Sequence, residues 1–192
     1  MAKKTIITIA GTLGSGKSST AKKVAMLLNY KRASTGDFMR SIAEERKLTL
    51  NELSKHAEID ESIDIALDNY NKEVGEQKEI VLDSRLGWYF IPDAFKVFLN
   101  LKPAIAAVRI LKDLESNPNR SNEDHNGFDS IESITTSIEK RLKSERKRYR
   151  DLYKISDHTD PKNFDLVIDT SLYTLDQVVE QIIVAYDEWL QS

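Results

Sequence analysis

The sequence predicts an α/β fold, a three-layer sandwich in which a central parallel sheet of about five strands lies between layers of helices. Two observations lead to this prediction. Short apolar runs rich in β-branched residues alternate along the chain with longer segments of helical periodicity, a pattern typical of parallel sheets. The first of these runs ends in a glycine-rich turn that opens directly into a helix. With 192 residues, 40% of them hydrophobic, we expect one domain, residues 1–192, around a single core.

The first half of the chain begins with a strand and continues with helices. Residues 5–10 (TIITIA) are short, apolar and β-branched, and they predict a buried strand. Residues 18–29 repeat small and apolar side chains at helical spacing, so a helix follows the turn. Residues 37–75 are predicted to be helical, and Thr49–Glu52 within them matches a capping box at the start of a helix.

The second half alternates strands with helices. Strands are predicted at residues 80–82, 95–101 and 164–168, and helices at residues 103–115, 130–153 and 175–189. Between the first two of these helices, residues 116–129 (SNPNRSNEDHNGFD) have no periodicity and indicate a loop or small lid. This order of elements completes the α/β pattern.

Composition excludes several classes of protein. The chain has no cysteine, which rules out disulfides, thiolate metal sites and a cysteine nucleophile. A net charge of −3 gives the whole molecule no general attraction to nucleic acid or anionic lipid. No apolar run approaches the roughly 20 residues that span a bilayer, and Lys3 and Lys4 are not followed by the apolar stretch of a signal peptide. We expect a cytoplasmic monomer that acts on small molecules, with neither nucleic acid nor a membrane as partner.

A phosphate-binding motif follows the first predicted strand. Residues 11–18 (GTLGSGKS) match GxxxxGK[ST] without a mismatch, in the strand-to-helix context that the motif requires. Its glycines let the backbone turn so that N–H groups and the helix N-terminus face the phosphates of ATP. The alternative is a chance glycine-rich turn, which the full match and its context disfavour. The residues expected to bind ATP are Gly11, Thr12, Leu13, Gly14, Ser15, Gly16, Lys17, Ser18 and Ser19.

The same region predicts a magnesium site. Lys17 would bridge the β- and γ-phosphates, and the Ser18 hydroxyl is placed to bind Mg²⁺ between them. Asp83 directly follows the apolar run 80–82 and is the acidic partner expected to reach the metal through water. An aspartate at a strand end is, by itself, more often a surface residue in a turn. With the motif present, we expect ATP and Mg²⁺ as cofactors.

The residues after the first helix resemble those of nucleoside monophosphate kinases. Residues 34–40 (STGDFMR) resemble the STGDxxR segment of adenylate and cytidylate kinases, whose terminal arginine grips the acceptor phosphate. The resemblance gives this role to Arg40 and places Thr35 in the acceptor site. In a helix that starts at Gly36–Asp37, Arg40 would lie about one turn after the helix N-terminus. From there its guanidinium group can bind two phosphate oxygens at once. The alternative is a solvated arginine on a helix.

A second segment is most similar to cytidylate kinases. Residues 83–88 (DSRLGW) and 91–99 (IPDAFKVFL) resemble the DGR and PDAxxKxFL patterns of bacterial members and the GRL and GW pattern of compact archaeal-type members. The resemblance covers nearly the whole chain, including a helical acceptor-binding insert at about 37–75. It implies that Arg85 is a second acceptor-phosphate ligand and that Asp83 lies near both metal and acceptor. The chain departs from the bacterial pattern at Ser84, where those members have glycine, and lacks one residue between Leu86 and Gly87 relative to the archaeal pattern.

The most basic stretch, residues 139–150 (EKRLKSERKRYR), lies in the predicted lid region at about 116–150. Arg141 and Arg148 are seven residues apart and share one face of a helix. The stretch resembles the ExRxxSExxRY pattern of archaeal-type members, and in monophosphate kinases such arginines clamp the transferring phosphoryl group. The alternative is a charged surface helix, and Arg109 on the preceding helix could also approach ATP. The catalytic residues expected from the resemblance are Lys17, Arg85, Arg141 and Arg148.

Which residue reads the acceptor base is left open. An acid in the insert could accept a hydrogen bond from the cytosine amino group, although acids on a charged helix usually face solvent. The candidates are Glu58, Asp60, Glu61, Asp64 and Asp68. His56, His125 and His158 show no ligand spacing, and we interpret them as surface or loop residues.

The function that the sequence predicts is transfer of the ATP γ-phosphoryl group to CMP or dCMP, which gives CDP or dCDP and ADP. An alternative keeps the fold but changes the acceptor to AMP, UMP or a non-nucleotide metabolite; Arg40 and Arg85 favour an acceptor that already carries phosphate. A further alternative is a partner- or RNA-associated ATPase. A GTPase is disfavoured because residues 100–103 (NLKP) do not form the base-reading NKxD motif.

Overall fold

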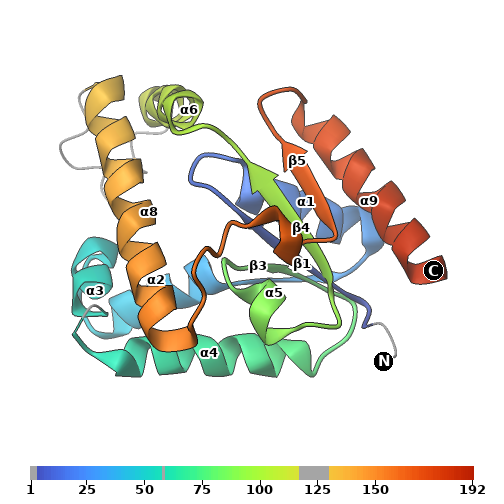
Figure 1. The fold of residues 1–192 in the computed structure, drawn as a ribbon, viewed down its shortest axis with the longest axis horizontal. Helices are drawn as coiled ribbons and strands as arrows, with labels where there is room; N and C mark the ends of the chain where they lie inside the picture. Colours follow the sequence, from blue (N-terminus) through green and yellow to red (C-terminus); the bar gives the residue numbers. More distant parts are fainter. Residues whose placement is uncertain (1–3, 58, 117–129) are drawn as a thin grey trace.

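A computed structural model of the protein describes residues 4–57, 59–116 and 130–192. Its five strands form one sheet in the order β2-β3-β1-β4-β5, and every neighbouring pair is parallel. Figure 1 shows this sheet at the centre, with helices on both sides. The predicted α/β sandwich is therefore confirmed. The strands are β1 (Ile6–Gly11), β2 (Lys31–Ser34), β3 (Ile80–Asp83), β4 (Phe95–Asn100) and β5 (Leu166–Asp169).

Each face of the sheet has its own apolar core. Helices α1 (Lys17–Leu28) and α9 (Leu175–Gln191) cover one face, where their small and branched side chains pack with those of β1 and β4. Helices α4 (Glu61–Gly75) and α5 (Gly87–Phe90) pack on the other face. All six residues of β1 are buried, as expected of a central parallel strand with helices on both sides.

The remaining helices form two further clusters beside the sheet. Helices α2 (Thr35–Glu45) and α3 (Leu50–His56) pack with the start of α4 around the fully buried side chain of Leu53. Helix α6 (Pro103–Ser116) packs against α8 (Ile131–Tyr153). In Figure 1, α8 runs along one side of the molecule, from α6 at one end to α4 at the other. It thereby connects the two clusters.

Local hydrogen bonds explain where several helices begin. The Ser34 hydroxyl accepts from the Asp37 backbone N–H at the start of α2. The predicted capping box is confirmed, because the Glu52 backbone N–H donates to the Thr49 hydroxyl while a Glu52 carboxylate oxygen accepts from the Thr49 N–H. Reciprocal capping pairs also open α8, at Ser130, and α9, at Thr174.

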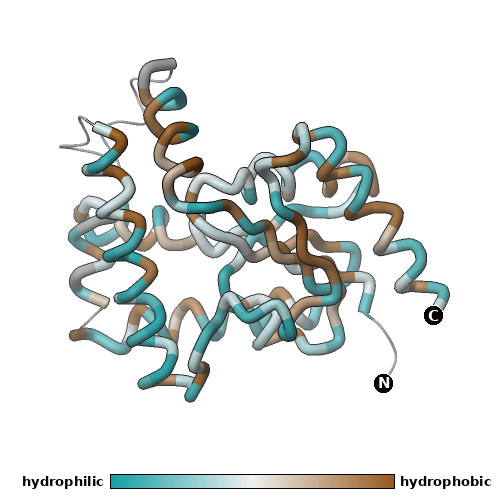
Figure 2. Tube along the Cα trace, turned by 45° about the horizontal axis from the view of Figure 1, so that its top comes forward, coloured by the Kyte–Doolittle hydropathy of each residue, from teal (hydrophilic) through white to brown (hydrophobic). Residues whose placement is uncertain are grey.

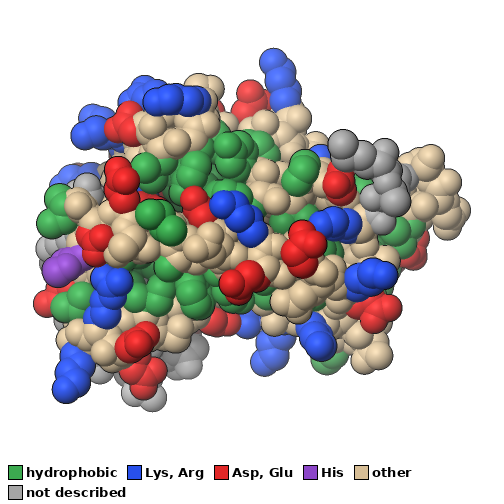
Figure 3. Space-filling model, turned by 90° about the horizontal axis from the view of Figure 1, so that it is seen from below, with side chains coloured by type: hydrophobic (Ala, Val, Ile, Leu, Met, Phe, Trp, Pro, Cys, Tyr) green, Lys and Arg blue, Asp and Glu red, His purple; other side chains and the backbone are tan. Residues whose placement is uncertain are grey.

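The distribution of apolar and charged side chains fits this layering. Figure 2 shows hydrophobic residues concentrated along the strands, whereas helices such as α8 alternate between hydrophobic and hydrophilic residues. On the face seen in Figure 3, basic and acidic side chains are interspersed and do not form a patch of one sign. Within the described ranges, the structure contains no helix with the length and apolar character needed to cross a membrane.

Two strands differ from the sequence prediction. Strand β2 was not predicted, because it is a four-residue edge strand in which Lys31 and Arg32 are exposed, so it has no apolar periodicity. Strand β5 begins two residues later than predicted, because Phe164 ends the 3₁₀ turn Pro161–Asn163. The segment 37–75, predicted to be helical throughout, contains the three helices α2, α3 and α4 with short breaks between them, and the one-turn helix α5 was not predicted. The other predicted strands and helices agree with the structure to within one or two residues at each end.

Candidate active site

The phosphate-binding loop joins β1 to α1 at the carboxyl edge of the sheet. At Gly11 a Cβ atom would lie 2.5 Å from the carbonyl oxygen of Leu99, so no larger residue fits. Gly14 and Gly16 have φ values of 71° and 86°, in the left-handed region that favours glycine. Gly16 immediately precedes α1 and has no side chain with which to cap its first N–H groups. The loop therefore offers backbone donors to an anion at the N-terminus of a helix.

The two predicted magnesium ligands lie together beside this loop. Strand β3 is the neighbour of β1, with Asp83 opposite Ile9, and this register brings Asp83 to the start of α1. The Ser18 hydroxyl donates to Oδ2 of Asp83 at 2.7 Å. One hydroxyl and one carboxylate are oxygen ligands of the kind that Mg²⁺ prefers, and Mg²⁺ usually takes its remaining ligands from water and substrate phosphates. The pair therefore fits the ion that the motif implies.

Lys17 lies among other charged side chains. Burial, followed by the neighbouring Arg85 guanidinium, lowers the pKa of Lys17 from 10.5 to about 8, while Asp83 and Glu145 act in the opposite direction. Arg141 also lowers this pKa. These side chains come from the start of α1, from the end of β3 and the segment after it, and from α8. The structure thus brings Arg85 and Arg141, for which the sequence predicts catalytic roles, close to Lys17.

A buried carboxylate, Glu145, joins the two arginines. Its Oε2 lies 3.1 Å from Nε of Arg85, and its Oε1 lies 3.2 Å from Nε of Arg141. Nε2 of His158 is 3.8 Å from Oε2. Burial opposes the charge on Glu145, but Arg85 and Arg141 outweigh burial and keep the pKa of Glu145 below its usual value. We did not predict Glu145 or His158 as site residues.

A signal for Glu145 is nevertheless present in the sequence. The side chains of α8 that the structure buries are Ile134, Ile138, Glu145 and Tyr149, which share one helical face. An acid on an otherwise apolar stripe indicates a buried charge that needs partners. His158 has no comparable signal. It lies in the loop after α8, which agrees with one of the two interpretations, but it is not a surface residue, because it is only 4% exposed and lies edge-on against the ring of Tyr149.

The acceptor residues predicted from residues 34–40 lie at the start of α2. The Thr35 hydroxyl donates to the backbone oxygen of Asp83 at 3.3 Å, so it is next to the predicted magnesium site. Arg40 is 44% exposed and is paired with Asp37 on its own helix. Arg32, which the sequence did not single out, pairs with Asp37 at 2.8 Å and lies 3.9 Å from Asp83.

Arg148 faces the helical insert, one turn further along α8 than Glu145. Its Nε lies 3.6 Å from Oδ1 of Asp64 on α4. Asp64 is 5% exposed, so the alternative that it faces solvent is wrong. Burial raises the pKa of Asp64, with Arg148 acting against this effect. Within the described part of the chain, Oδ2 of Asp64 and Nε of Arg148 are buried without a hydrogen-bond partner.

A second contact between α8 and the insert lies near the end of the helix. The Tyr153 hydroxyl donates to Oδ1 of Asp68 at 2.8 Å.

The other arginines considered in the sequence have partners elsewhere. Arg109 on α6 donates to the backbone oxygen of Thr170, just after β5, at 2.6 Å. Arg146 pairs with Asp157 and is 43% exposed. Glu58, His125 and residues 117–129 of the predicted lid lie outside the described residues.

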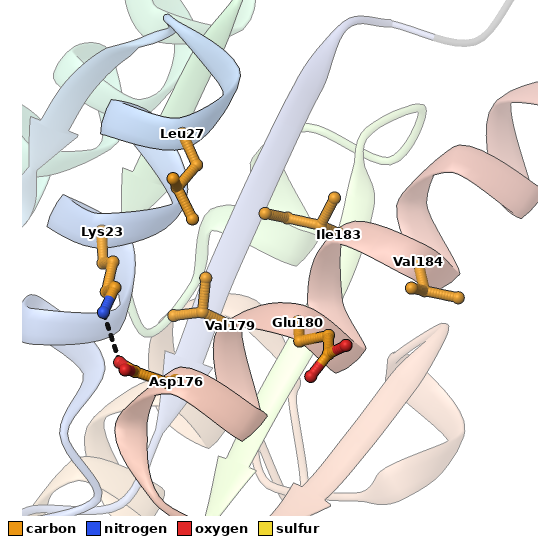
Figure 4. Close-up of a pocket in the computed structure, with 7 residues that line it drawn as sticks. All are labelled: Lys23, Leu27, Asp176, Val179, Glu180, Ile183 and Val184. Carbon is orange, nitrogen blue, oxygen red and sulfur yellow. Dashed lines mark hydrogen bonds and ion pairs between the residues drawn. The ribbon is translucent and has the colours of Figure 1, made fainter.

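A pocket on the outer surface between α1 and α9 is separate from this site (Figure 4). Lys23 and Asp176 form an ion pair at one side of it. None of the predicted ATP, acceptor or metal ligands lines it. The residues that line it are Lys23, Leu27, Asp176, Val179, Glu180, Ile183 and Val184.

A five-stranded parallel sheet, a glycine-rich loop before α1, and arginines gathered around the loop lysine together define a kinase of the P-loop class. Comparison with known sequences gives the family. The chain belongs to the cytidylate kinase-like family, whose model matches residues 6–172.

Curated relatives agree with this assignment. A cytidylate kinase from Natronomonas pharaonis is 37% identical over 187 residues, which cover 94% of this chain and 90% of the relative. An S-adenosylmethionine-dependent nucleotide dehydratase from Lacinutrix mariniflava is 34% identical over 96% of this chain, but the match spans only 36% of that protein. Shikimate kinase from Bacteroides thetaiotaomicron has the same fold, with a TM-score of 0.67 at 15% identity and coverage of 95% of this chain and 98% of that structure.

Proposed function

We propose that this chain is an ATP-dependent cytidylate kinase that transfers the γ-phosphoryl group of ATP to CMP or dCMP, giving ADP and CDP or dCDP. The observation that carries this proposal is the gathering of Arg85 and Arg141, linked by Glu145, close to Lys17 at the carboxyl edge of the sheet. An ATP phosphate chain that meets a monophosphate needs this concentration of positive charge. The family and the cytidylate kinase relatives support the same function.

In this proposal each residue has a role in charge stabilisation. The loop donors and Lys17 bind the β- and γ-phosphates, while Arg40 and Arg85 bind the acceptor phosphate together with Thr35 and Asp83. When bound between Ser18 and Asp83, Mg²⁺ would neutralise charge on the phosphates. An acceptor oxygen forms a bond to the γ-phosphorus as the bond to the ADP oxygen breaks. A phosphate monoester is largely a dianion at pH 7, so the protein need not supply a general base.

The proposal also assigns the larger parts of the chain. Residues 1–192 form one domain, with the acceptor-binding insert at about 37–75 and the lid at about 116–150. Arg141 and Arg148 act from the described part of that lid, on α8. We further propose that the protein acts on small molecules as a monomer in the cytoplasm.

The pair Asp64 and Arg148 supports cytosine as the acceptor base. Cytosine presents an amino donor beside acceptor atoms on its pairing edge, whereas uracil presents an oxygen acceptor in place of the amino group. A carboxylate can accept from the amino group while a guanidinium donates to the acceptors. Both side chains have a buried polar atom without a hydrogen-bond partner among the described residues, as expected of groups that a ligand completes.

This base assignment makes a prediction for Asp64→Asn. The amide can donate to the uracil oxygen, so the ratio of kcat/KM for CMP to that for UMP should fall at least tenfold, corresponding to about 1.4 kcal/mol of discrimination. The measurement is steady-state kinetics with each monophosphate. Glu61→Gln is the matched control, because Glu61 is exposed on the same helix. An unchanged ratio in Asp64→Asn would remove Asp64 from base recognition.

The function itself is tested by ADP formation from ATP and Mg²⁺ with CMP, dCMP, UMP, AMP or GMP supplied singly, beside a control without acceptor. We expect turnover with CMP or dCMP far above the others. Preference for another monophosphate would keep the kinase mechanism and change the base. Absence of acceptor-dependent turnover would contradict the proposal and favour a non-nucleotide acceptor or an associated ATPase.

A further inference from the structure

Glu145 is an unusual residue for a site that binds polyanions. It lies on α8 and only 9% of its surface is exposed. It also carries a negative charge close to Lys17, where phosphate groups are expected to bind. A buried carboxylate is costly unless it is paired, and here it would also repel the substrates. Its presence therefore calls for a role that outweighs this repulsion.

The contacts of Glu145 identify that role. Each of its oxygens contacts Nε of a different arginine, and the two arginines come from separate parts of the chain, Arg85 after β3 and Arg141 on α8. A guanidinium has five N–H donors, so a contact through Nε is compatible with phosphate binding by others. Held by one carboxylate, the two guanidinium groups have a fixed relation to each other before any substrate binds.

The charges around Lys17 explain why an anion is needed. Lys17, Arg85 and Arg141 are three cations in one region, and each arginine lowers the pKa of Lys17 by repulsion. Glu145 acts in the opposite direction and is itself stabilised by both arginines. The buried side chain of His158 also lies against this carboxylate, with its Nε2 at 3.8 Å from Oε2 of Glu145.

We propose that Glu145 is a positioning residue, which holds Arg85 and Arg141 together beside the phosphate-binding loop so that both guanidinium groups are in place when the phosphoryl group transfers. This role rests on the proposed function, because it assumes that the two arginines contact the transferring phosphates. Groups that are already oriented do not have to reorganise during the reaction, which favours the transition state over the bound substrates.

A positioning role and a merely structural role give different kinetics. Replacing Glu145 with Gln keeps its size but removes the negative charge. The site then becomes more positive, so ground-state binding of ATP and CMP should be as tight as before or tighter. The arginines lose their common anchor, so transition-state stabilisation should decrease. The expected signature is a lower kcat without a higher KM, whereas a loosened fold would raise KM as kcat falls.

The experiment measures kcat and both KM values for wild type, Glu145→Gln and Glu132→Gln with the acceptor that the wild type prefers. Glu132 is exposed on the same helix and serves as the control. We expect kcat of Glu145→Gln to fall at least tenfold, with KM for ATP and for the acceptor no higher than in wild type, and the control to stay within twofold. A kcat within twofold of wild type, or a KM that rises in step with the loss of kcat, would overturn the proposal.

Two additional variants make the result independent of folding and of the proposed function. If Glu145→Gln does not fold, Glu145→Asp takes its place, because it keeps the negative charge but its shorter side chain no longer reaches both arginines. Its kcat is likewise expected to fall without a rise in KM. In an Arg141→Met background, the loss caused by Glu145→Gln should shrink at least threefold, because one partner is already absent. Equal losses in both backgrounds would refute the positioning role. A wild type inactive with every monophosphate would instead refute the proposed function.

Discussion

Lys17, which we propose binds the phosphates of ATP, has surroundings that disfavour its positive charge. Its charge is partly buried beside Arg85 and Arg141, and its pKa is lowered to about 8 by burial and by these neighbours. The unfolded chain therefore binds the proton of the Lys17 ammonium group more tightly than the folded protein does. Stability from this group is lowest at neutral pH and rises as pH increases from about 8 toward 10.5, where both states lose the proton.

Replacing Lys17 with Met should therefore stabilise the unliganded protein while it abolishes ATP binding. We expect the free energy of unfolding at pH 7 to rise by on the order of 2 kcal/mol, a value discounted for the partial exposure of the side chain. The gain over wild type should shrink above pH 8. Urea unfolding at pH 7 and pH 9.5 measures both effects, with Lys22→Met on the exposed face of α1 as control. A gain that does not change with pH would contradict this account.

Residues whose role depends on local spacing could be predicted from the sequence, and residues whose role depends on packing could not. The loop glycines, Lys17 and Ser18 form a contiguous motif, and Asp83 follows directly from the end of an apolar run. The environments of Asp64 and His158 depend on which helix or ring lies against them. Asp64 and the exposed Glu61 are both acids in the first turn of α4, and the structure distinguishes them by the contact of Asp64 with Arg148 on α8.

At the scale of elements, the contact between β1 and β4 positions the phosphate-binding loop. Gly11 pairs with Leu99 across the sheet, and the Thr12 N–H donates to the Leu99 carbonyl oxygen at 3.2 Å. A side chain at Gly11 would meet that same oxygen. The loop therefore begins at a point where the two backbones approach as closely as glycine permits.

The variant Gly11→Ala should test this contact. A Cβ atom 2.5 Å from a backbone oxygen forces the strands apart, and we expect a loss of about 2–3 kcal/mol in the free energy of unfolding. Gly36→Ala is the control, because a Cβ there lies 3.6 Å from its nearest neighbour and alanine favours the helix. Thermal or urea unfolding measures both variants. Equal stability of the two would show that β1 and β4 can separate without cost.

Elements with a strong periodic pattern were predicted, whereas the short elements β2 and α5, which have no such pattern, were missed. Strands β1, β3 and β4 are apolar because helices cover both of their faces, and α9 has a regular apolar stripe. Strand β2 carries exposed basic residues at the edge of the sheet. The pairing of β2 with β3 places Ser34 opposite Asp83, and the four residues of β2 have no sequence pattern that predicts this pairing.

For the whole molecule, α8 connects the two regions that we propose bind ATP and the acceptor. Its middle contacts the arginine beside the phosphate-binding loop through Glu145, and its end contacts the insert through Tyr153 and Asp68. A ligand that orders one end of this helix should favour the arrangement required at the other. ATP-site and acceptor-site binding are therefore expected to be coupled.

Thermal unfolding with ADP, Mg²⁺ and CMP measures this coupling without turnover. Each ligand should raise Tm, by an amount equivalent to about 2.7 kcal/mol at a hundredfold excess over Kd, and the two together should raise it by more than the sum. Chelation of Mg²⁺ should reduce the effect of ADP. Tyr153→Phe removes the bond to Asp68 and should bring the combined effect closer to the sum. Additive shifts in the wild type would show that α8 does not couple the sites.

The direction of the chain through the sheet determines where another protein can be fused to this one. Strand β1 starts, and helix α9 ends, at the amino edge of the sheet, and Figures 1 and 2 place the start of β1 and the end of α9 on the same side of the molecule. The phosphate-binding loop lies at the opposite edge. A tag or a second catalytic unit fused at either end is therefore expected to project away from the proposed nucleotide site and to leave catalysis intact. This geometry makes the fold suitable as a module within longer polypeptides.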